Sequence, residues 1–289
     1  MFKKEVDVDI VAANYNNGKY LHQFINSIID STVWPQQLII VDDASTDNSI
    51  DIINSYSEHK LNIKLVALSK NVGFANALNE GIKHVTATNI LRIDPDDIMC
   101  ADRLKKQFEF ISNNTSVDVV GCDVTYFAED EHIITGHSDF PSEHEEIVKC
   151  YEEGNHGMCH GATLFSTKCL IKESYIQKNV PAEEYDIFSR LIKQNYIFAN
   201  IQEPLTLVRI HTSSVSNNMP YSTVAKTFKL RESLWNKKSS KFYVFKEYIA
   251  RNAYRKYIST QSYSRYFSLL IAASMKPSSA LKRLFGNAK

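Results

Sequence analysis

The first 125 residues of this 289-residue chain alternate between short apolar runs and segments with helical spacing of apolar residues. Short apolar runs are typical of buried strands, and apolar residues three and four positions apart are typical of helices packed on a sheet. Strands are expected at 6–13, 37–41, 62–68, 89–93 and 117–126, and helices at 19–29, 47–57, 75–84 and 101–112. Because such strands must be joined by crossovers, the pattern predicts an α/β fold with a Rossmann-like, mostly parallel sheet flanked by helices.

The pattern loosens after residue 127. Further helices are expected at 143–153 and 183–193, and strands at 162–166, 196–201 and 205–210. Glu203-Pro204 reads as a turn between the last two strands, because Pro and polar residues favour turns. Beyond Met219-Pro220 the chain reads as helices. We therefore divide it into an α/β domain at 1–217 and a helical extension at 218–289.

The C-terminal extension is basic and aromatic, although the formal net charge of the whole chain is zero. Residues 225–289 hold 15 Lys and Arg against 2 acids, whereas residues 1–224 hold 18 against 31. Such asymmetry indicates an anionic partner or surface. Rings interleaved with cations suit a membrane interface; docking on the acidic domain and a homodimer contact are the alternatives. No recognition motif indicates nucleic acid.

The chain carries no signal that would place it outside the cytoplasm. No stretch approaches the roughly 20 apolar residues of a membrane-spanning helix. The lysines at the start have no apolar segment behind them, unlike those of a signal peptide. The five cysteines are widely spaced without a C-x-x-C pair and read as reduced thiols. We expect a cytoplasmic protein, either free or at the inner face of the cell membrane.

Polar clusters follow four successive predicted strands. They lie at 14–18, 42–45, 71–73 and 94–97. Each could be an ordinary turn, because Asn, Asp and Gly are common turn residues. In an open α/β sheet, however, the carboxyl ends of parallel strands meet at one edge, where ligands bind. The sequence therefore predicts a ligand site at this edge.

The cluster after the fourth strand is Asp94-Pro95-Asp96-Asp97. Three carboxylates at one strand end repel one another unless a cation neutralises them. Mg²⁺ and Mn²⁺ prefer oxygen ligands, and Mg²⁺ is often shared with substrate phosphates. The cluster predicts a metal and diphosphate site, with an acidic turn before the next helix as the alternative.

Three other groups of residues are candidates for binding or chemistry. Asp42 and Asp43 can accept hydrogen bonds from a ribose or a base, and Tyr15 can stack on a base; an Asx turn is the alternative. Arg209 and His211 share one face of a strand and suit an anionic group. Glu183, Glu184 and Asp186 open a helix, where they serve either as general base or as partners of the helix dipole. His160 is a further candidate, with a structural role as the default.

Six segments in order resemble the motifs of the family 2 glycosyltransferases. IVAANYN at 10–16 is similar to the opening P-x-Y-N strand, and VDDASTD at 41–47 to VDDGSTD. NVGFANALNEG at 71–81 resembles N-x-G-x-x-x-A-x-N-x-G, and IDPDD at 93–97 the D-x-D region. AEEYDIF at 182–188 resembles AEDYDLW, and RIHTSSVS at 209–216 the closing R-x-H-x-x-S-x-S. The resemblance spans about 7–217.

The resemblance implies an inverting enzyme of GT-A fold that moves a sugar from a nucleoside-diphosphate donor, commonly a UDP-sugar. It implies Mn²⁺ or Mg²⁺ as cofactor and a glycan or polyprenyl-linked acceptor in surface polysaccharide synthesis. By resemblance, the donor is bound by residues of the first four strand ends and the closing motif: Ala13, Tyr15, Asp42, Asp43, Asn71, Gly73, Asp94 and Arg209. The metal would be held by Asp96, with Asp97 and His211 as further ligands.

The resemblance places the catalytic base at Glu184, where the family has Asp, with Glu183 and Asp186 as alternatives. A second departure is Leu78, where many members carry Arg near the pyrophosphate. A non-catalytic nucleotide-sugar-binding protein of the same fold therefore stays open as the alternative. A dinucleotide oxidoreductase would need a Gly-rich turn after the first strand, where this chain has a single Gly.

Overall fold

The computed structural model describes residues 3–210, 219–260 and 263–276. It divides into two compact units. The first comprises Met1–Thr125 and His137–Val208, and the second comprises Tyr126–Gly136 and Arg209–Lys289.

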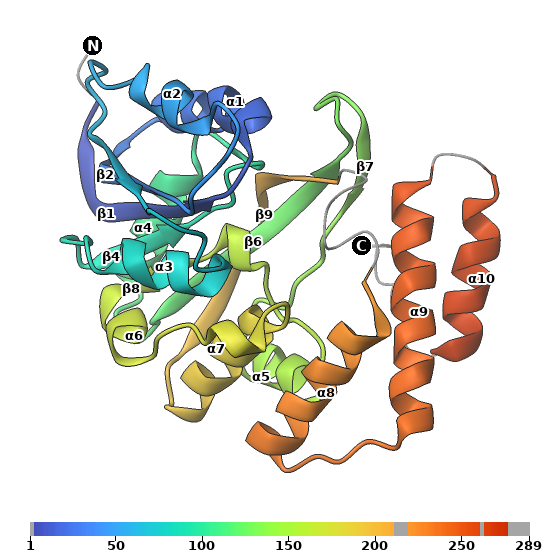
Figure 1. The fold of residues 1–289 in the computed structure, drawn as a ribbon. Helices are drawn as coiled ribbons and strands as arrows, with labels where there is room; N and C mark the ends of the chain where they lie inside the picture. Colours follow the sequence, from blue (N-terminus) through green and yellow to red (C-terminus); the bar gives the residue numbers. More distant parts are fainter. Residues whose placement is uncertain (1–2, 211–218, 261–262, 277–289) are drawn as a thin grey trace. The chain divides into compact units, whose positions relative to one another are not determined.

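The strands pair into a nine-stranded sheet in the order β3-β2-β1-β4-β8-β6-β9-β5, with β7 paired to β6 (Figure 1). The strands are β1 (Glu5–Asn14), β2 (Trp34–Asp42), β3 (Ile63–Ala67), β4 (Asn89–Arg92), β5 (Ile98–Met99), β6 (Val119–Phe127), β7 (Ile134–His137), β8 (Leu164–Ser166) and β9 (Phe198–Arg209). β3, β2, β1 and β4 pair in parallel, whereas β8 pairs antiparallel with β4 and β6. The predicted α/β fold is confirmed, and the parallel part is its first four predicted strands.

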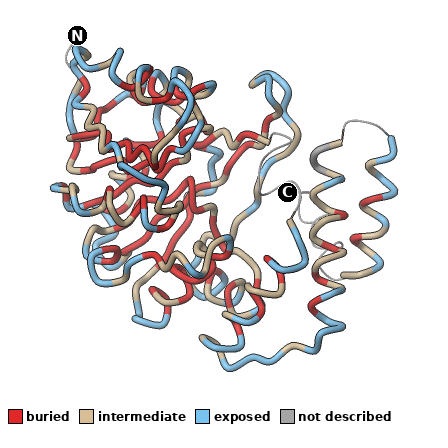
Figure 2. Tube along the Cα trace, viewed as in Figure 1, coloured by how far each residue is buried: buried red, intermediate tan, exposed pale blue. Residues whose placement is uncertain are grey.

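Helices cover both faces of the parallel strands. The first unit contains α1 (Gly18–Ile29), α2 (Ser49–Asn54), α3 (Phe74–Ile82), α4 (Arg103–Asn113), α5 (His144–Glu152), α6 (Thr167–Lys172) and α7 (Glu183–Lys193), with the 3-10 turns η1 (His160–Ala162) and η2 (Gln177–Asn179). Alternate β1 residues such as Val8 and Ile10 join a core with α1, α2 and α4. Gly81 of α3 lies against Val11 and Val41 on the opposite face. The period-2 alternation of β1 thus serves two helical layers, and buried residues gather along the strands (Figure 2).

The predicted turn at Glu203-Pro204 is wrong. One continuous strand, β9, runs from Phe198 to Arg209. Proline has no backbone N–H to donate to a neighbouring strand. It is therefore tolerated in a strand only where no carbonyl of the neighbouring strand needs a hydrogen bond from that position. The partner strand β5 pairs with Thr206 and Leu207 and does not reach Pro204. Gln202, Glu203 and Pro204 itself are exposed, so the strand continues through the proline.

The described part of the second unit includes three helices: α8 (Tyr221–Trp235), α9 (Lys241–Ser259) and α10 (Arg265–Met275). Phe228 of α8 packs with Val224 and with Val244 of α9. α9 and α10 pack side by side (Figure 1). Lys276, just beyond α10, contacts the buried carboxylate of Glu247 in α9 at 2.6 Å. Among the described residues, no helix is both long and apolar enough to cross a membrane.

Candidate active site

The ends of β1 and β2 are joined by buried polar side chains. Asn14 and Asp42 are partners in the parallel register, and Asn14 Nδ2 donates to Asp42 Oδ2 at 2.7 Å. The other Asp42 oxygen accepts from the Ser45 amide at 2.8 Å. Asp42 is fully buried, so its carboxylate holds the loop of residues 42–45 in shape.

Asp43 connects β2 to the start of α3. Its carboxylate accepts from the amides of Val72 at 2.7 Å and Gly73 at 2.9 Å. Asn71 Nδ2 donates to the Asp43 carbonyl at 3.2 Å. Gly73 has φ of 89°, a backbone conformation that favours glycine. Asp42, Asp43, Asn71 and Gly73 therefore lie together in one network, as the strand-end pattern predicts.

The two residues predicted to bind the donor at the end of β1 and just after it differ in exposure. Ala13 is buried in the strand, whereas Tyr15, in the loop after it, is 49% exposed. An exposed ring beside the loop of residues 42–45 is free of the core and available for stacking. Asn16 Oδ1 accepts from the amide of Thr46, the residue after this loop, at 2.8 Å and so fixes the backbone there.

The three predicted acids after β4 come together. Oxygen atoms of Asp94, Asp96 and Asp97 lie within 4.8 Å of one another. Asp97 is buried, and the other two are partly exposed. An all-oxygen set with one open side matches the ligand preference of Mg²⁺ and Mn²⁺. The residues present therefore fit a hard divalent cation.

Two buried arginines stand beside the acids, and sequence reasoning missed both. Arg92, the last residue of β4, forms a two-pronged ion pair with Asp94. Arg103 of α4 donates to the carbonyl oxygens of Arg92 at 2.8 Å and Gly161 at 3.1 Å. Burial disfavours the charge of Arg92, but the contact with Asp94 outweighs it and keeps the pKa of Arg92 above its usual value. A cation inside an apolar strand was the available signal, because buried charges are nearly always paired.

The three acids of α7 occupy different environments. Asp186 is buried and pairs with Arg190 Nε at 3.0 Å. Glu184 is partly exposed and lies 3.4 Å from His156 Nδ1. Burial, and then the neighbouring charge of Glu184, raise the pKa of Glu183 to about 7. Asp186 is thus committed to its ion pair, which leaves the two glutamates as the better candidates for proton transfer.

His160 is surrounded by aromatic rings. Its Nε2 lies 2.7 Å from the Tyr175 hydroxyl, and Phe74, Phe165 and Phe188 make edge contacts with the imidazole. Burial and the nearby Arg92 lower the pKa of His160 well below its usual value. A neutral, enclosed imidazole is a packing residue, so the default structural interpretation fits.

Arg209, the first residue of the closing motif, belongs to the second unit. The Arg209 guanidinium lies 4.4 Å from the Phe127 ring centre and donates to the Glu129 carbonyl at 2.8 Å. His211 lies outside the described residues. The roles predicted for both stay predictions.

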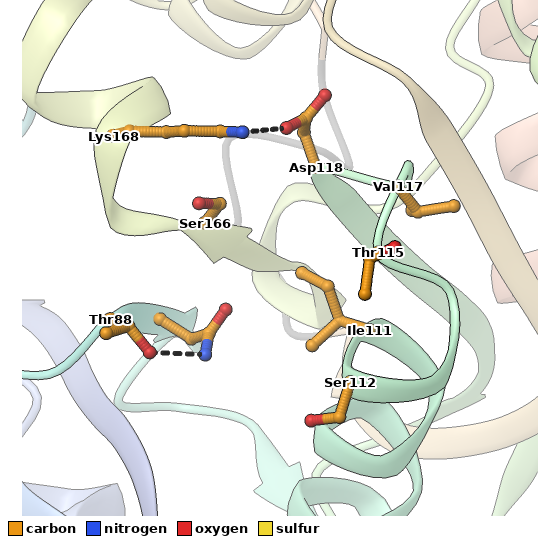
Figure 3. Close-up of a pocket in the computed structure, with 9 residues that line it drawn as sticks. Thr88, Ile111, Ser112, Thr115, Val117, Asp118, Ser166 and Lys168 are labelled. Carbon is orange, nitrogen blue, oxygen red and sulfur yellow. Dashed lines mark hydrogen bonds and ion pairs between the residues drawn. The ribbon is translucent and has the colours of Figure 1, made fainter.

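A pocket of about 230 Å³ lies away from these acids. Its lining includes Thr88 and Asn89, at the start of β4, whereas the acids follow the end of that strand. Lys168 crosses it to Asp118 at 2.6 Å (Figure 3). This internally satisfied ion pair offers little to a ligand, so the acid-lined edge is the candidate active site.

The chain matches the model of glycosyl transferase family 2 over residues 9–176 and belongs to that family. The putative glycosyltransferase EpsE of Bacillus subtilis is 30% identical over 206 residues, covering 70% of this chain and 72% of its own length. The amylovoran biosynthesis glycosyltransferase AmsE of Erwinia amylovora is 24% identical over 217 residues, covering 74% of this chain and 80% of its own.

The fold is also similar to a solved glycosyltransferase structure. The mannosyltransferase PcManGT of Pyrobaculum calidifontis, in complex with GDP-Man and Mn²⁺, superposes with a TM-score of 0.61. The match covers 98% of this chain and 79% of that one at 17% identity, and it supports the GT-A-like fold. The protein is thus a glycosyltransferase of family 2, and the predicted family is confirmed.

Proposed function

We propose that this glycosyltransferase transfers a sugar from a nucleoside-diphosphate donor, a UDP-sugar by preference, to a hydroxyl of a glycan or lipid-linked glycan, with inversion at the anomeric carbon. The observation that carries the proposal is the gathering of three carboxylates at the end of β4, beside the network of Asp42 and Asp43. The PcManGT complex with GDP-Man and Mn²⁺ supports a nucleotide-sugar donor and a divalent cation.

The acids of this edge divide into donor and cation groups. In the proposal Asp96 and Asp97 hold Mn²⁺ or Mg²⁺, and Asp94 faces the donor sugar. A bound divalent cation offsets the negative charge that develops on the leaving diphosphate. The network around Asp43 fixes the backbone at Asn71 and Gly73, which borders the donor. The exposed ring of Tyr15 stacks on the base.

Glu184 is the proposed base. An acceptor hydroxyl has a high pKa, so a carboxylate close to it must take its proton as the new bond forms. The Glu184 side chain is partly exposed beside His156, where an acceptor can reach it. The hydroxyl oxygen then bonds to the anomeric carbon as the bond from that carbon to the diphosphate oxygen breaks. The proton passes to Glu184, and the electron pair leaves with the nucleoside diphosphate.

The acceptor is proposed to be glycan-linked, and membrane-anchored through a polyprenyl chain. The similarity to AmsE, named for amylovoran biosynthesis, supports polysaccharide synthesis. The basic and aromatic character of helices α9 and α10 supports a location of the enzyme at the inner surface of the cell membrane.

The test combines donor binding with turnover. Thermal shifts of the protein with UDP-, GDP- and dTDP-sugars, with and without Mn²⁺, should find one donor that stabilises only with metal. Glu184→Gln should keep that shift and lose turnover by about 10²-fold or more. If Glu183→Gln loses turnover instead, the base is Glu183. Donor binding without turnover or hydrolysis in the unaltered protein would favour the non-catalytic binder, and no shift with any donor would defeat the proposal.

A further inference from the structure

We propose that Arg92 is a positioning residue for donor binding. It holds both carboxylate oxygens of Asp94 and so reserves Asp94 for the donor, leaving Asp96 and Asp97 for the cation. The inference rests on the proposed function and assigns a role to a residue outside the family motifs.

Arg92 is an unusual residue for its place. It ends β4 behind Ile90 and Leu91, and only 3% of it is exposed. Buried arginines require partners, because an unpaired buried charge is very costly. Nη1 contacts Asp94 Oδ2 and Nη2 contacts Oδ1, the parallel arrangement that fits a carboxylate best. The pair therefore fixes both the place and the plane of the Asp94 carboxylate.

Neighbouring elements fix the position of Arg92. The Phe74 ring centre lies 5.2 Å from its central carbon, and Arg103 Nη2 holds the Arg92 carbonyl at 2.8 Å. The Arg92 amide donates to the Thr163 carbonyl at 2.8 Å. Contacts to α3, α4 and the turn before β8 thus converge on Arg92, one on its guanidinium and two on its backbone.

Gly161 completes the fit by having no side chain. A Cβ atom at this position would lie 2.9 Å from Arg92 Nη1 and 3.0 Å from Asp94 Oδ2. It would also approach Asp97 Oδ2 to 3.3 Å. A larger residue would therefore press on the tips of both side chains, and at least one of them would have to shift. The bare backbone at Gly161 therefore protects the geometry of Arg92 and Asp94.

The charges explain why the pair separates the roles of the acids. Three carboxylates face the guanidiniums of Arg92 and Arg103, which leaves a net charge of −1 that still attracts a divalent cation. Asp94 already shares both oxygens with a cation, so it is a weaker metal ligand than Asp96 or Asp97. Its side chain is still 34% exposed, and its remaining lone pairs can accept from a sugar hydroxyl.

The test is a double-mutant cycle of Arg92→Met and Asp94→Asn, with Asp96→Asn as the metal-site control. Mn²⁺ affinity is measured by electron paramagnetic resonance without donor, and donor affinity by calorimetry with Mn²⁺ present. Arg92→Met makes the acids more negative, so we expect Mn²⁺ to bind several-fold tighter while the donor binds about tenfold weaker. A merely structural role would weaken both. Asp96→Asn should weaken Mn²⁺ binding by at least tenfold.

The double variant separates action through Asp94 from other causes. It removes both charges and leaves no unpaired ion, so it also guards against a single variant that fails to fold. If Arg92 acts through Asp94, Arg92→Met/Asp94→Asn should bind the donor as Asp94→Asn does. Gly161→Ala should weaken donor binding without changing any charge. Arg92→Lys should not restore binding, because an ammonium cannot make the two-pronged contact.

Two results would overturn the role of Arg92. One is a loss of Mn²⁺ affinity in Arg92→Met as large as that in Asp96→Asn. The other is a loss of donor affinity in the double variant that equals the product of the factors lost in the two single variants. A failure of the unaltered protein to bind any nucleotide-sugar with Mn²⁺ is a different outcome and would count against the proposed function itself.

Discussion

The three acids and the two buried arginines at the end of β4 differ in what brings them together. Asp94, Asp96 and Asp97 are adjacent in sequence, and a strand followed by three acids indicates a cation site without knowledge of the fold. Arg92 and Arg103 could not be assigned in this way. Their roles depend on Gly161, which is far away in sequence and is brought to them by β8 and η1. Tertiary contact, rather than local pattern, creates this part of the site.

Glu183 gives a prediction about pH. Its pKa rises from the ordinary 4.5 to about 7 in the folded protein, so the folded state holds a proton that the unfolded chain has lost over this interval. The contribution to stability is therefore full below pH 4.5 and is lost as pH rises through 7. A pKa difference of this size corresponds to at most about 3 kcal/mol of folding free energy.

Glu183→Gln tests this prediction, because glutamine fills the same space without titrating. Urea unfolding at pH 5 and pH 8 measures the free energy of unfolding of the metal-free proteins. This free energy should increase in the variant relative to the unaltered protein as pH rises. Glu109→Gln serves as control, since its carboxylate is exposed on α4 and should leave the difference nearly unchanged. Parallel stability profiles for the unaltered protein and Glu183→Gln would show that Glu183 is ionised across the whole range.

Among the helices and strands, those of the first 125 residues were predictable because their apolar periods differ clearly. The 3.6 period of α1 and the alternation of β1 each match a buried face. β9 was not predictable, because Glu203-Pro204 carries a turn signal that local sequence cannot cancel. The short reach of β5 along β9 leaves Pro204 without a partner on that side.

The N-terminus of α3 is capped by a side chain that is distant in sequence. Gln177 Oε1 of η2 accepts from the amides of Ala75 at 3.0 Å and Asn76 at 3.2 Å. These are first-turn groups without partners inside the helix, so a side-chain acceptor stabilises it. Gln177→Ala should destabilise the protein by about 1 kcal/mol, by analogy with the loss of a helix cap. Urea or thermal unfolding measures this.

A matched control separates the cap from general surface effects. Lys172 is an exposed residue at the end of α6, and Lys172→Ala should change stability by less than about 0.5 kcal/mol. Because α3 begins beside Asp43 and Gly73, Gln177→Ala should also weaken donor binding. Equal stability of the two alanine variants would show that the cap contributes nothing.

The two compact units follow contact rather than sequence order. Tyr126–Gly136 belongs to the second unit although the first surrounds it in sequence, and no change of composition marks these residues. The basic, aromatic character of the C-terminal helices, in contrast, is visible in composition. It extends to the folded surface, because Phe267 and Leu270 of α10 are 69% and 67% exposed. Glu247, the single acid of residues 241–276, is buried and pairs with Lys276.

This exposed apolar and basic surface predicts binding to anionic membranes. Vesicles containing anionic lipid should bind the full-length protein, and binding should fall as salt rises from about 0.1 to 1 M, since salt screens exposed charges. Burying two exposed apolar side chains contributes about 1.5–3 kcal/mol each when complete. Phe267→Ser/Leu270→Ser should therefore weaken vesicle binding by about tenfold or more, as sedimentation of vesicles would measure.

The matched control removes an equally exposed apolar side chain from the other unit. Ile171 of α6 is 72% exposed, and Ile171→Ser should leave vesicle binding unchanged. Turnover with a water-soluble acceptor should be the same in all three proteins, because none of these residues lies among the acids after β4. Equal vesicle binding by the unaltered protein and Phe267→Ser/Leu270→Ser would place the basic helices against another protein surface. In that case docking on the acidic domain or a homodimer contact would account for the charge asymmetry.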